Sequence, residues 1–256
     1  MIKVDNMKRN ILILLAIMLM IPSYAMAKSD TDWKAYKKYG DRSEKWDAFV
    51  EAGFSAFESG NLGTAEMFFQ RAIARGMNDG LVYTKIGLYF EAQGNYEKAL
   101  ELFKKAEILL PKQYPKHPDT KSIYEYMGRV LFVWGKIDEA TPYLQKSLTN
   151  NENFMALYFL GQIYRAKAEL QSAIIFFERA LKAKRPEGLS IDVDILIMSE
   201  LGKIYYEMKN YDVSLEWWNK IIGMEAGNQT ARSYLDDIQK MKYKERERKV
   251  LEQMVN

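Results

Sequence analysis

Hydrophobic and small residues recur with a helical period between Tyr83 and Pro111, in the stretch YTKIGLYFEAQGNYEKALELFKKAEILLP. Three large aromatic residues alternate there with two small residues: Tyr83, Phe90 and Phe103, with Gly87 and Ala99. The small residues let two helices approach closely, and the aromatic rings fill the space beside that contact. Gly94-Asn95 supplies a tight turn between the two helices. The stretch therefore predicts a pair of antiparallel helices.

The same arrangement recurs along the chain, and a glycine of the first helix marks each copy: Gly53, Gly87, Gly128, Gly161 and Gly202. It resembles the tetratricopeptide repeat, in which aromatic-x2-Leu-Gly-x2-Tyr is followed by Ala-x3-Phe and then Pro over about 34 residues. The resemblance implies an all-α, right-handed α-solenoid of about five helix-turn-helix units. These units are expected near residues 46–79, 80–113, 121–153, 154–187 and 195–228.

The copies depart from the repeat in a few places. Two spacings between the glycines are longer than one repeat, so two insertions are expected between units. The first, residues 111–120, contains three prolines, which favour an irregular and extended connection. The second, residues 184–194, contains a proline and a glycine and predicts another irregular loop. Ala168 stands in the fourth unit at the position where a turn glycine is expected.

Residues 229–256 follow the last unit and predict a capping helix, which begins after Asn228 and covers the end of the solenoid. Within this helix, the segment Lys240 to Lys249 carries six basic and two acidic residues. Such a run is typical of a solvated helix face, and contact with an anionic surface is the alternative interpretation.

The first 27 residues have the features of a secretory signal peptide. Lys8-Arg9 precede the apolar run of residues 11–21, and Ala25-Met26-Ala27 forms a cleavage site. The run is shorter than the about 18 to 20 residues that span a bilayer, so cleavage is expected rather than retention as an anchor. Residues 28–45 are expected to form a leader, which either packs on the first unit or docks a partner.

The absence of cysteine excludes a disulfide framework and a lipid-modified cysteine at the cleavage point. An exported protein without cysteine is suited to an oxidising compartment. The sequence therefore predicts an exported, periplasmic protein of a bacterium, and secretion from the cell is the alternative.

Residue composition leaves little basis for catalysis. A single histidine, His117, and no cysteine exclude a Cys–His pair and a metal site with several histidines. His117 lies in the predicted loop 111–120, which is a poor place to hold an imidazole rigidly. Residues 28–256 carry 34 basic and 33 acidic residues, so no basic field indicates nucleic acid. The sequence predicts a protein that is not an enzyme and that uses neither a metal nor a cofactor.

In the tetratricopeptide family the first helix of each unit lines a concave groove, and the resemblance implies which residues face it. Glu91 and Glu125 project to this side, together with the residues that we assign to partner binding: Val50, Phe54, Leu88, Arg129, Phe132, Tyr158, Gln162, Arg165, Lys203 and Tyr206. Family members that clamp a C-terminal carboxylate have Lys and Asn where this chain has Val50 and Phe54. That ligand is therefore not expected here.

A groove with apolar positions and three cations suits an extended peptide or helix that has apolar anchors and acidic residues. The sequence therefore predicts a non-enzymatic protein–protein interaction module or scaffold in the bacterial cell envelope. One alternative is a structural component that self-associates or docks through convex residues such as Trp217. Another is an adaptor that contacts a membrane surface through the basic C-terminal helix. The sequence does not indicate the partner, the pathway or the oligomeric state.

Overall fold

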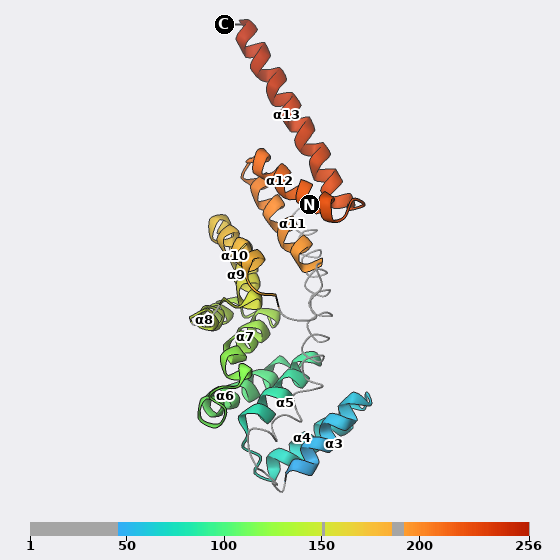
Figure 1. Ribbon diagram of the computed structural model, residues 1–256, viewed down its shortest axis with the longest axis vertical. Coiled ribbons are helices and arrows are strands. Elements are labelled where there is room, and N and C mark those ends of the chain that lie inside the picture. The colour runs from blue at the N-terminus through green and yellow to red at the C-terminus, as the bar shows by residue number, and fades with distance from the viewer. Residues whose placement is uncertain (1–45, 150–151, 186–191, 256) are drawn as a thin grey trace. The chain divides into compact units, whose positions relative to one another are not determined.

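The computed structural model describes residues 46–149, 152–185 and 192–255 of the chain. These residues form helices joined by turns, with no strand among them, so the predicted all-α class is confirmed. The helices, labelled in Figure 1, are α3 (Asp47–Glu58), α4 (Leu62–Ala74), α5 (Gly80–Ala92), α6 (Tyr96–Gln113), α7 (Pro118–Val133), α8 (Ile137–Ser147), α9 (Phe154–Ala166), α10 (Leu170–Lys182), α11 (Asp192–Glu207), α12 (Tyr211–Met224) and α13 (Gln229–Val255).

Contacts between residues divide the described part of the chain into one unit that ends at residue 156 and a second that begins at residue 157. Among the described residues, the first unit holds α3 to α8 and the first three residues of α9, and the second holds the rest of α9 with α10 to α13. In the first unit α3 packs on α4, α5 on α6 and α7 on α8, and α6 also packs on α7. In the second unit α11 packs on α10 and α12, and α12 also packs on α13.

The glycines of the repeat pattern lie where the two helices of a pair touch. A Cβ atom on Gly87 would lie 2.5 Å from Cε1 of Phe103, far inside an ordinary van der Waals contact. The other four glycines have the same relation to a residue sixteen positions later, at 2.5–2.6 Å: Gly53 to Phe69, Gly128 to Leu144, Gly161 to Phe177 and Gly202 to Trp218. These five partner side chains have no exposed surface. The interpretation of the glycines as close-approach positions is therefore confirmed.

The two helices of each pair are joined by a three-residue turn whose middle residue has a left-handed backbone. The φ angles at these positions are 75° at Gly60, 74° at Gly94 and 83° at Gly135, but the last two turns use Ala168 at 60° and Lys209 at 59°. In each turn the following N–H donates to a carbonyl five residues earlier, for example from Asn95 to Phe90 at 2.8 Å. This bond closes the first helix of the pair in the manner of a Schellman motif.

The predicted irregular loop over residues 111–120 is wrong for most of its length. Helix α6 continues through Pro111 to Gln113, and α7 begins at Pro118, so only residues 114–117 connect the two helices. Because Pro111 lies near the end of α6, it removes a single hydrogen bond. The side chain of Gln113 holds this end by accepting from Gly80 N–H at 2.8 Å. Pro118 occupies the first position of α7, where no intrahelical bond to its nitrogen is needed.

The second predicted loop, residues 184–194, lies partly outside the described residues. Its last described portion is helical, because α11 begins at Asp192. The predicted signal peptide of residues 1–27 and the leader of residues 28–45 lie wholly outside the described residues. Among the helices that the structure describes, none is both long enough and apolar enough to cross a membrane.

Helix α13 begins as predicted after Asn228, whose side-chain oxygen accepts from Ala231 N–H at 2.9 Å. Its N-terminal part packs on α12 through Ala231 and Ile238, which are fully buried. The Tyr234 ring stacks on the Trp218 indole with ring centroids 4.4 Å apart. Trp218 is thus covered on one side by the close-approach glycine of α11 and on another by α13.

Candidate functional site

The first helices of neighbouring pairs carry ordered polar side chains, and in the first unit these side chains centre on Arg129 of α7. The guanidinium of Arg129 donates to both carboxylate oxygens of Glu91 on α5, from Nε at 2.7 Å and from Nη2 at 2.6 Å. Its Nη1 donates to Glu125, one turn earlier on α7, at 2.8 Å. Arg129 is 1% exposed, so this bidentate arrangement holds a buried charge between two helices.

The electrostatics of this cluster favour the charged guanidinium. Burial by itself lowers the pKa of Arg129, but the neighbouring carboxylates of Glu91 and Glu125 outweigh that effect and raise its pKa above the ordinary value. Arg129 also lies over the ring of Tyr126, with the guanidinium carbon 5.2 Å from the ring centroid. The cation that the sequence assigns to a partner is therefore already bonded within its own unit.

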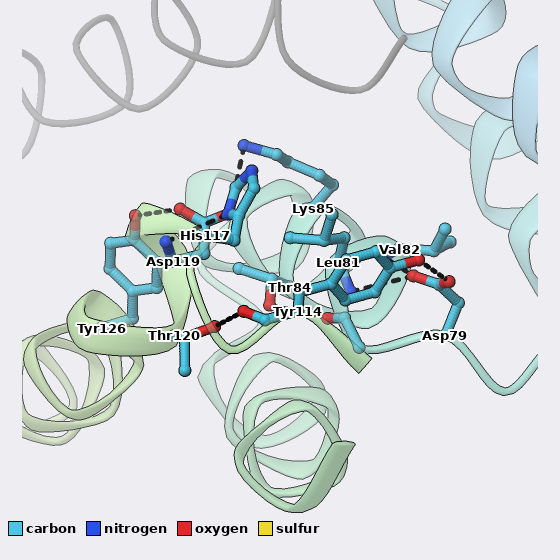
Figure 2. A network of polar contacts seen from close by, with 11 residues as sticks. Asp79, Leu81, Val82, Thr84, Lys85, Tyr114, His117, Asp119, Thr120 and Tyr126 are labelled. Carbon is cyan, nitrogen blue, oxygen red and sulfur yellow. Dashed lines mark hydrogen bonds and ion pairs between the residues drawn. The ribbon is translucent and has the colours of Figure 1, made fainter. Parts of the chain in front are cut away.

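A second polar network lies where α6 ends and α7 begins, and Figure 2 shows it from close by. His117 is the N-cap of α7: its Nδ1 accepts from Asp119 N–H at 3.1 Å. Because Nδ1 is an acceptor there, a neutral imidazole carries its proton on Nε2. The Asp119 carboxylate accepts from Tyr126 OH at 3.1 Å and lies 3.5 Å from Lys85 Nζ. His117 and the other three side chains of this group are all buried.

The same network secures the start of α5. One carboxylate oxygen of Asp79 accepts from the N–H groups of Leu81 and Val82, at 2.9 and 3.1 Å, and the other accepts from Tyr114 OH. Thr120 Oγ1 donates to the Tyr114 carbonyl at 2.6 Å. Burial, followed by the charge of Asp119, raises the pKa of Tyr126 well above its ordinary value, so this hydroxyl stays protonated. These contacts fix the α6–α7 connection, in which His117 is buried and hydrogen-bonded.

In the second unit a row of polar side chains runs between α9 and α11. Arg165 of α9 donates through both terminal nitrogens to Glu207 of α11, from Nη1 at 2.9 Å. Glu200 lies 3.8 Å from Arg165 Nε and accepts from Lys203 Nζ at 2.6 Å. Gln162 donates to Tyr158 OH at 3.1 Å. Two cations and two carboxylates thus form one connected set across facing helices.

Tyr158 lies beside this row, where it is buried. Burial, with a smaller effect of the Glu200 carboxylate, raises the pKa of Tyr158 well above its ordinary value. Tyr158 therefore acts as a hydrogen-bonding phenol at any physiological pH. Tyr206, near the C-terminal end of α11, makes edge-to-face ring contacts with Tyr211 and Tyr234, with ring centroids 5.6 and 5.3 Å apart.

The sequence-predicted groove residues fall into two sets by exposure. One set is buried and offers little surface to a partner: Val50, Phe54, Leu88, Arg129 and Tyr158. The other set is partly exposed: Phe132, Gln162, Arg165, Lys203 and Tyr206. Within the second unit the structure brings Gln162, Arg165 and Lys203 to facing helices together with Tyr158. The role of both sets in partner binding stays a prediction.

The acidic partners of the predicted cations were not assigned from the sequence. Glu200 and Glu207 lie two residues before and five residues after the repeat glycine of α11, and Glu91 and Glu125 project to the groove side of α5 and α7. The sequence did contain an indication of these partners, because an acid and a base on the first helices of successive helix pairs come close when these helices pack side by side. Lys85, Asp119 and Tyr126 were missed because their network depends on the path of residues 114–117.

Two family models match the chain, both described as tetratricopeptide repeat, over residues 78–153 and 127–188. A TPR repeat-containing protein of Methanocaldococcus jannaschii is 23% identical over 234 residues, which are 81% of this chain and 40% of that protein. The chain thus spans about two fifths of the length of this curated relative. Both comparisons support the tetratricopeptide repeat family.

Solved structures with a similar fold include one that is described as a TPR protein. MamA of Desulfovibrio magneticus RS-1, residues 41 to the end, is 18% identical with a TM-score of 0.58, covering 73% of this chain and 98% of that chain. YrrB, described as a TPR protein with an unusual peptide-binding site, is 16% identical with a TM-score of 0.56, covering 80% of this chain and 98% of that chain. At these identities the similarity shows the fold alone.

Proposed function

We propose that this protein is an interaction module of the bacterial cell envelope that captures a segment of another protein along the first helices of its repeats. The observation that carries the proposal is the polar row between α9 and α11, where side chains from the first helices of two successive helix pairs are held in place by ion pairs. A preformed surface binds with a smaller loss of conformational entropy than a flexible one. The peptide-binding site named for YrrB supports a peptide as the class of ligand.

The pairing of the groove cations defines the chemistry of the partner. Arg129, Arg165 and Lys203 are each bonded to a glutamate of their own unit, so an acidic partner residue has to compete with an internal carboxylate. Affinity in the second unit therefore comes mainly from apolar anchors against partly exposed side chains such as Tyr206, and the polar row sets orientation. The partner that fits is an extended segment or helix with apolar side chains and few charges.

A matched pair of charge reversals in the second unit tests this proposal. Lys203→Glu changes the polar row on α11, whereas Lys220→Glu places the same change on α12, where Lys220 lies over the Trp217 ring at 3.9 Å. We expect proteins captured from an envelope extract to be lost with Lys203→Glu and kept with Lys220→Glu. Gln162→Ala should also weaken capture. Because it introduces no charge beside Glu200, it is less disruptive than Lys203→Glu and controls for a loss of capture through misfolding.

The outcome that overturns the proposal is an unchanged set of captured proteins for both α11 and α9 variants, with circular dichroism showing intact helices. Sedimentation of the free protein addresses the structural alternative. A stable oligomer that dissociates when Trp217 is replaced by alanine would favour self-association over capture of a partner.

The envelope location rests on the predicted signal peptide and needs its own measurement. Fractionation of the source cells, followed by mass determination of the isolated protein, should give a periplasmic species that begins at Lys28. A cytoplasmic species that retains residues 1–27 would overturn this part of the proposal.

A further inference from the structure

Helix α13 has two parts with different surroundings. Residues 229–241 pack on α12 and contribute Ala231 and Ile238 to the core of the second unit. Beyond Met241, every side chain that the structure describes except Lys242 is exposed. This distal part, residues 242–255, is about 20 Å long at 1.5 Å per residue and has no core of its own. An isolated helix of this length is marginal in water, so a surface that covers it would stabilise it.

The distal part has an apolar stripe on a different side of the helix from the packed part. Tyr243, Val250, Leu251 and Met254 are 68%, 54%, 58% and 78% exposed. At 3.6 residues per turn these four positions fall within about 100° of one another. The stripe lies about 150° around the helix from the face that Ala231 and Ile238 present to α12. The stripe is therefore not a continuation of the capping contact.

Charges are distributed around the stripe in a definite order. Lys240, Lys244 and Arg246 lie within or beside the stripe, and none of these three forms an ion pair among the described residues. Glu245 and Glu252 lie on the opposite side, where they pair with Lys249 at 3.1 Å and with Arg248 at 3.6 Å. Among residues 240–254, Glu247 is the one acidic residue that falls within the stripe, and Asp236, which precedes this segment, lies on the same side of the helix. The stripe thus carries an excess of positive charge on its own side.

From this arrangement we propose that residues 240–254 of α13 lie on an anionic lipid surface, with the apolar stripe in the interface and the three cations reaching the headgroups. Long basic side chains beside a narrow apolar face suit such a surface, because they extend their charges toward the headgroups while their stems stay apolar. Insertion across the bilayer is not part of the proposal, since no described helix is apolar enough to span it. The proposal does not depend on the groove.

A second copy of the helix fits this face less well. A parallel pair that buried the stripe would place Lys240 and Glu247 at core positions of the seam, each against the same residue of the other copy. Like charges in those positions destabilise the pair. Anionic lipid instead offers opposite charge to Lys240, Lys244 and Arg246 at the same time.

The experiment uses the absence of cysteine, which allows one residue to be labelled at a time. The full chain carries an environment-sensitive fluorophore at Leu251→Cys, and a second preparation carries it at Ile108→Cys, which is exposed on α6. Each is titrated with vesicles of phosphatidylcholine alone and of phosphatidylcholine with phosphatidylglycerol, at low and high salt. The Leu251 label should shift to the blue only with the anionic vesicles, and less at high salt. The Ile108 label should not shift.

Matched triple variants separate the α13 cations from net charge. Lys240→Gln, Lys244→Gln and Arg246→Gln together should weaken the vesicle affinity at the Leu251 label about a hundredfold. A control replaces three exposed lysines elsewhere, Lys104, Lys112 and Lys116, by glutamine and should keep the affinity within about threefold. Glu247→Gln should strengthen binding, because it removes the acidic residue from the stripe.

Several results would overturn the proposal. The first is that the Leu251 label does not shift with anionic vesicles, and the second is that it shifts equally with both lipid compositions. The third is that the two triple variants lose vesicle affinity equally. A shift that depends on protein concentration without vesicles would assign the stripe to a second copy instead. Circular dichroism of each variant checks that α13 and the repeats remain folded.

Discussion

The left-handed turn residue Ala168 provides a quantitative test of how the repeats are built. Its φ of 60° is the conformation that glycine supplies in three of the five turns. A residue with a Cβ atom in this region costs about 1–2 kcal/mol, whereas glycine there loses about 0.5–1 kcal/mol through its greater freedom in the unfolded chain. Ala168→Gly should therefore raise the free energy of unfolding by roughly 0.5–1 kcal/mol.

The control is the same substitution two residues earlier. Ala166 is the last residue of α9 and has a helical backbone, so Ala166→Gly should lower the free energy of unfolding by up to about 1 kcal/mol. Urea unfolding followed by circular dichroism measures both, and a change of 1 kcal/mol moves the midpoint by roughly 0.3–1 M. Midpoints that move in the same direction for the two variants would refute the reasoning.

A reciprocal change tests the strain without a packing contribution. Gly135 has a φ of 83°, and a Cβ atom there would meet nothing within 4 Å. Gly135→Ala should therefore lower stability by about 1 kcal/mol through backbone strain alone. An unchanged midpoint would show that these turns tolerate a side chain and that the gain expected for Ala168→Gly has no basis.

Three further predictions concern packing, charge and capping. Gly161→Ala should lower the free energy of unfolding by about 1–3 kcal/mol, because its Cβ would lie 2.6 Å from the Phe177 ring. Adding Phe177→Leu should restore part of that loss, and additive effects of the two substitutions in a double-mutant cycle would contradict this. Arg129→Met should lower the free energy of unfolding by about 3–5 kcal/mol at neutral pH, because it leaves the carboxylates of Glu91 and Glu125 without their cation. A loss below about 1 kcal/mol would contradict the buried pairing. Lys136→Asn should add about 1 kcal/mol, since the N-cap of α8 makes no side-chain bond, and an unchanged urea midpoint would count against it.

The helix pairs were predictable from the sequence because their contacts are local. Gly87 and Phe103 are sixteen residues apart in one pair, and the size pattern alone indicates that one makes room for the other. The left-handed residue of the fifth turn was harder to assign, because Lys209 gives no compositional signal for it. Its position follows only by analogy with the glycines of the earlier turns.

The candidate site was less predictable because it depends on contacts between successive helix pairs. Projection onto a helix placed Arg129 and Arg165 on the groove side, but it did not indicate that Glu91 and Glu207 on neighbouring first helices would bind them. The prediction of an irregular loop for the proline-rich segment was wrong for a related reason. Pro111 disfavours a helix locally, yet the buried Leu110 and the bond from Gly80 to Gln113 keep α6 helical to its end. Contacts distant in sequence decided both cases.

Site-specific photo-crosslinking in living source cells tests the central proposal most directly. A photoreactive amino acid replaces Tyr206 on α11 in one strain and Trp217 on α12 in another, and both positions are partly exposed. Capture of a partner along the first helices predicts a discrete adduct with another protein from position 206, which Lys203→Glu abolishes, and none from position 217. Adducts from position 217 with none from position 206 would contradict the proposal.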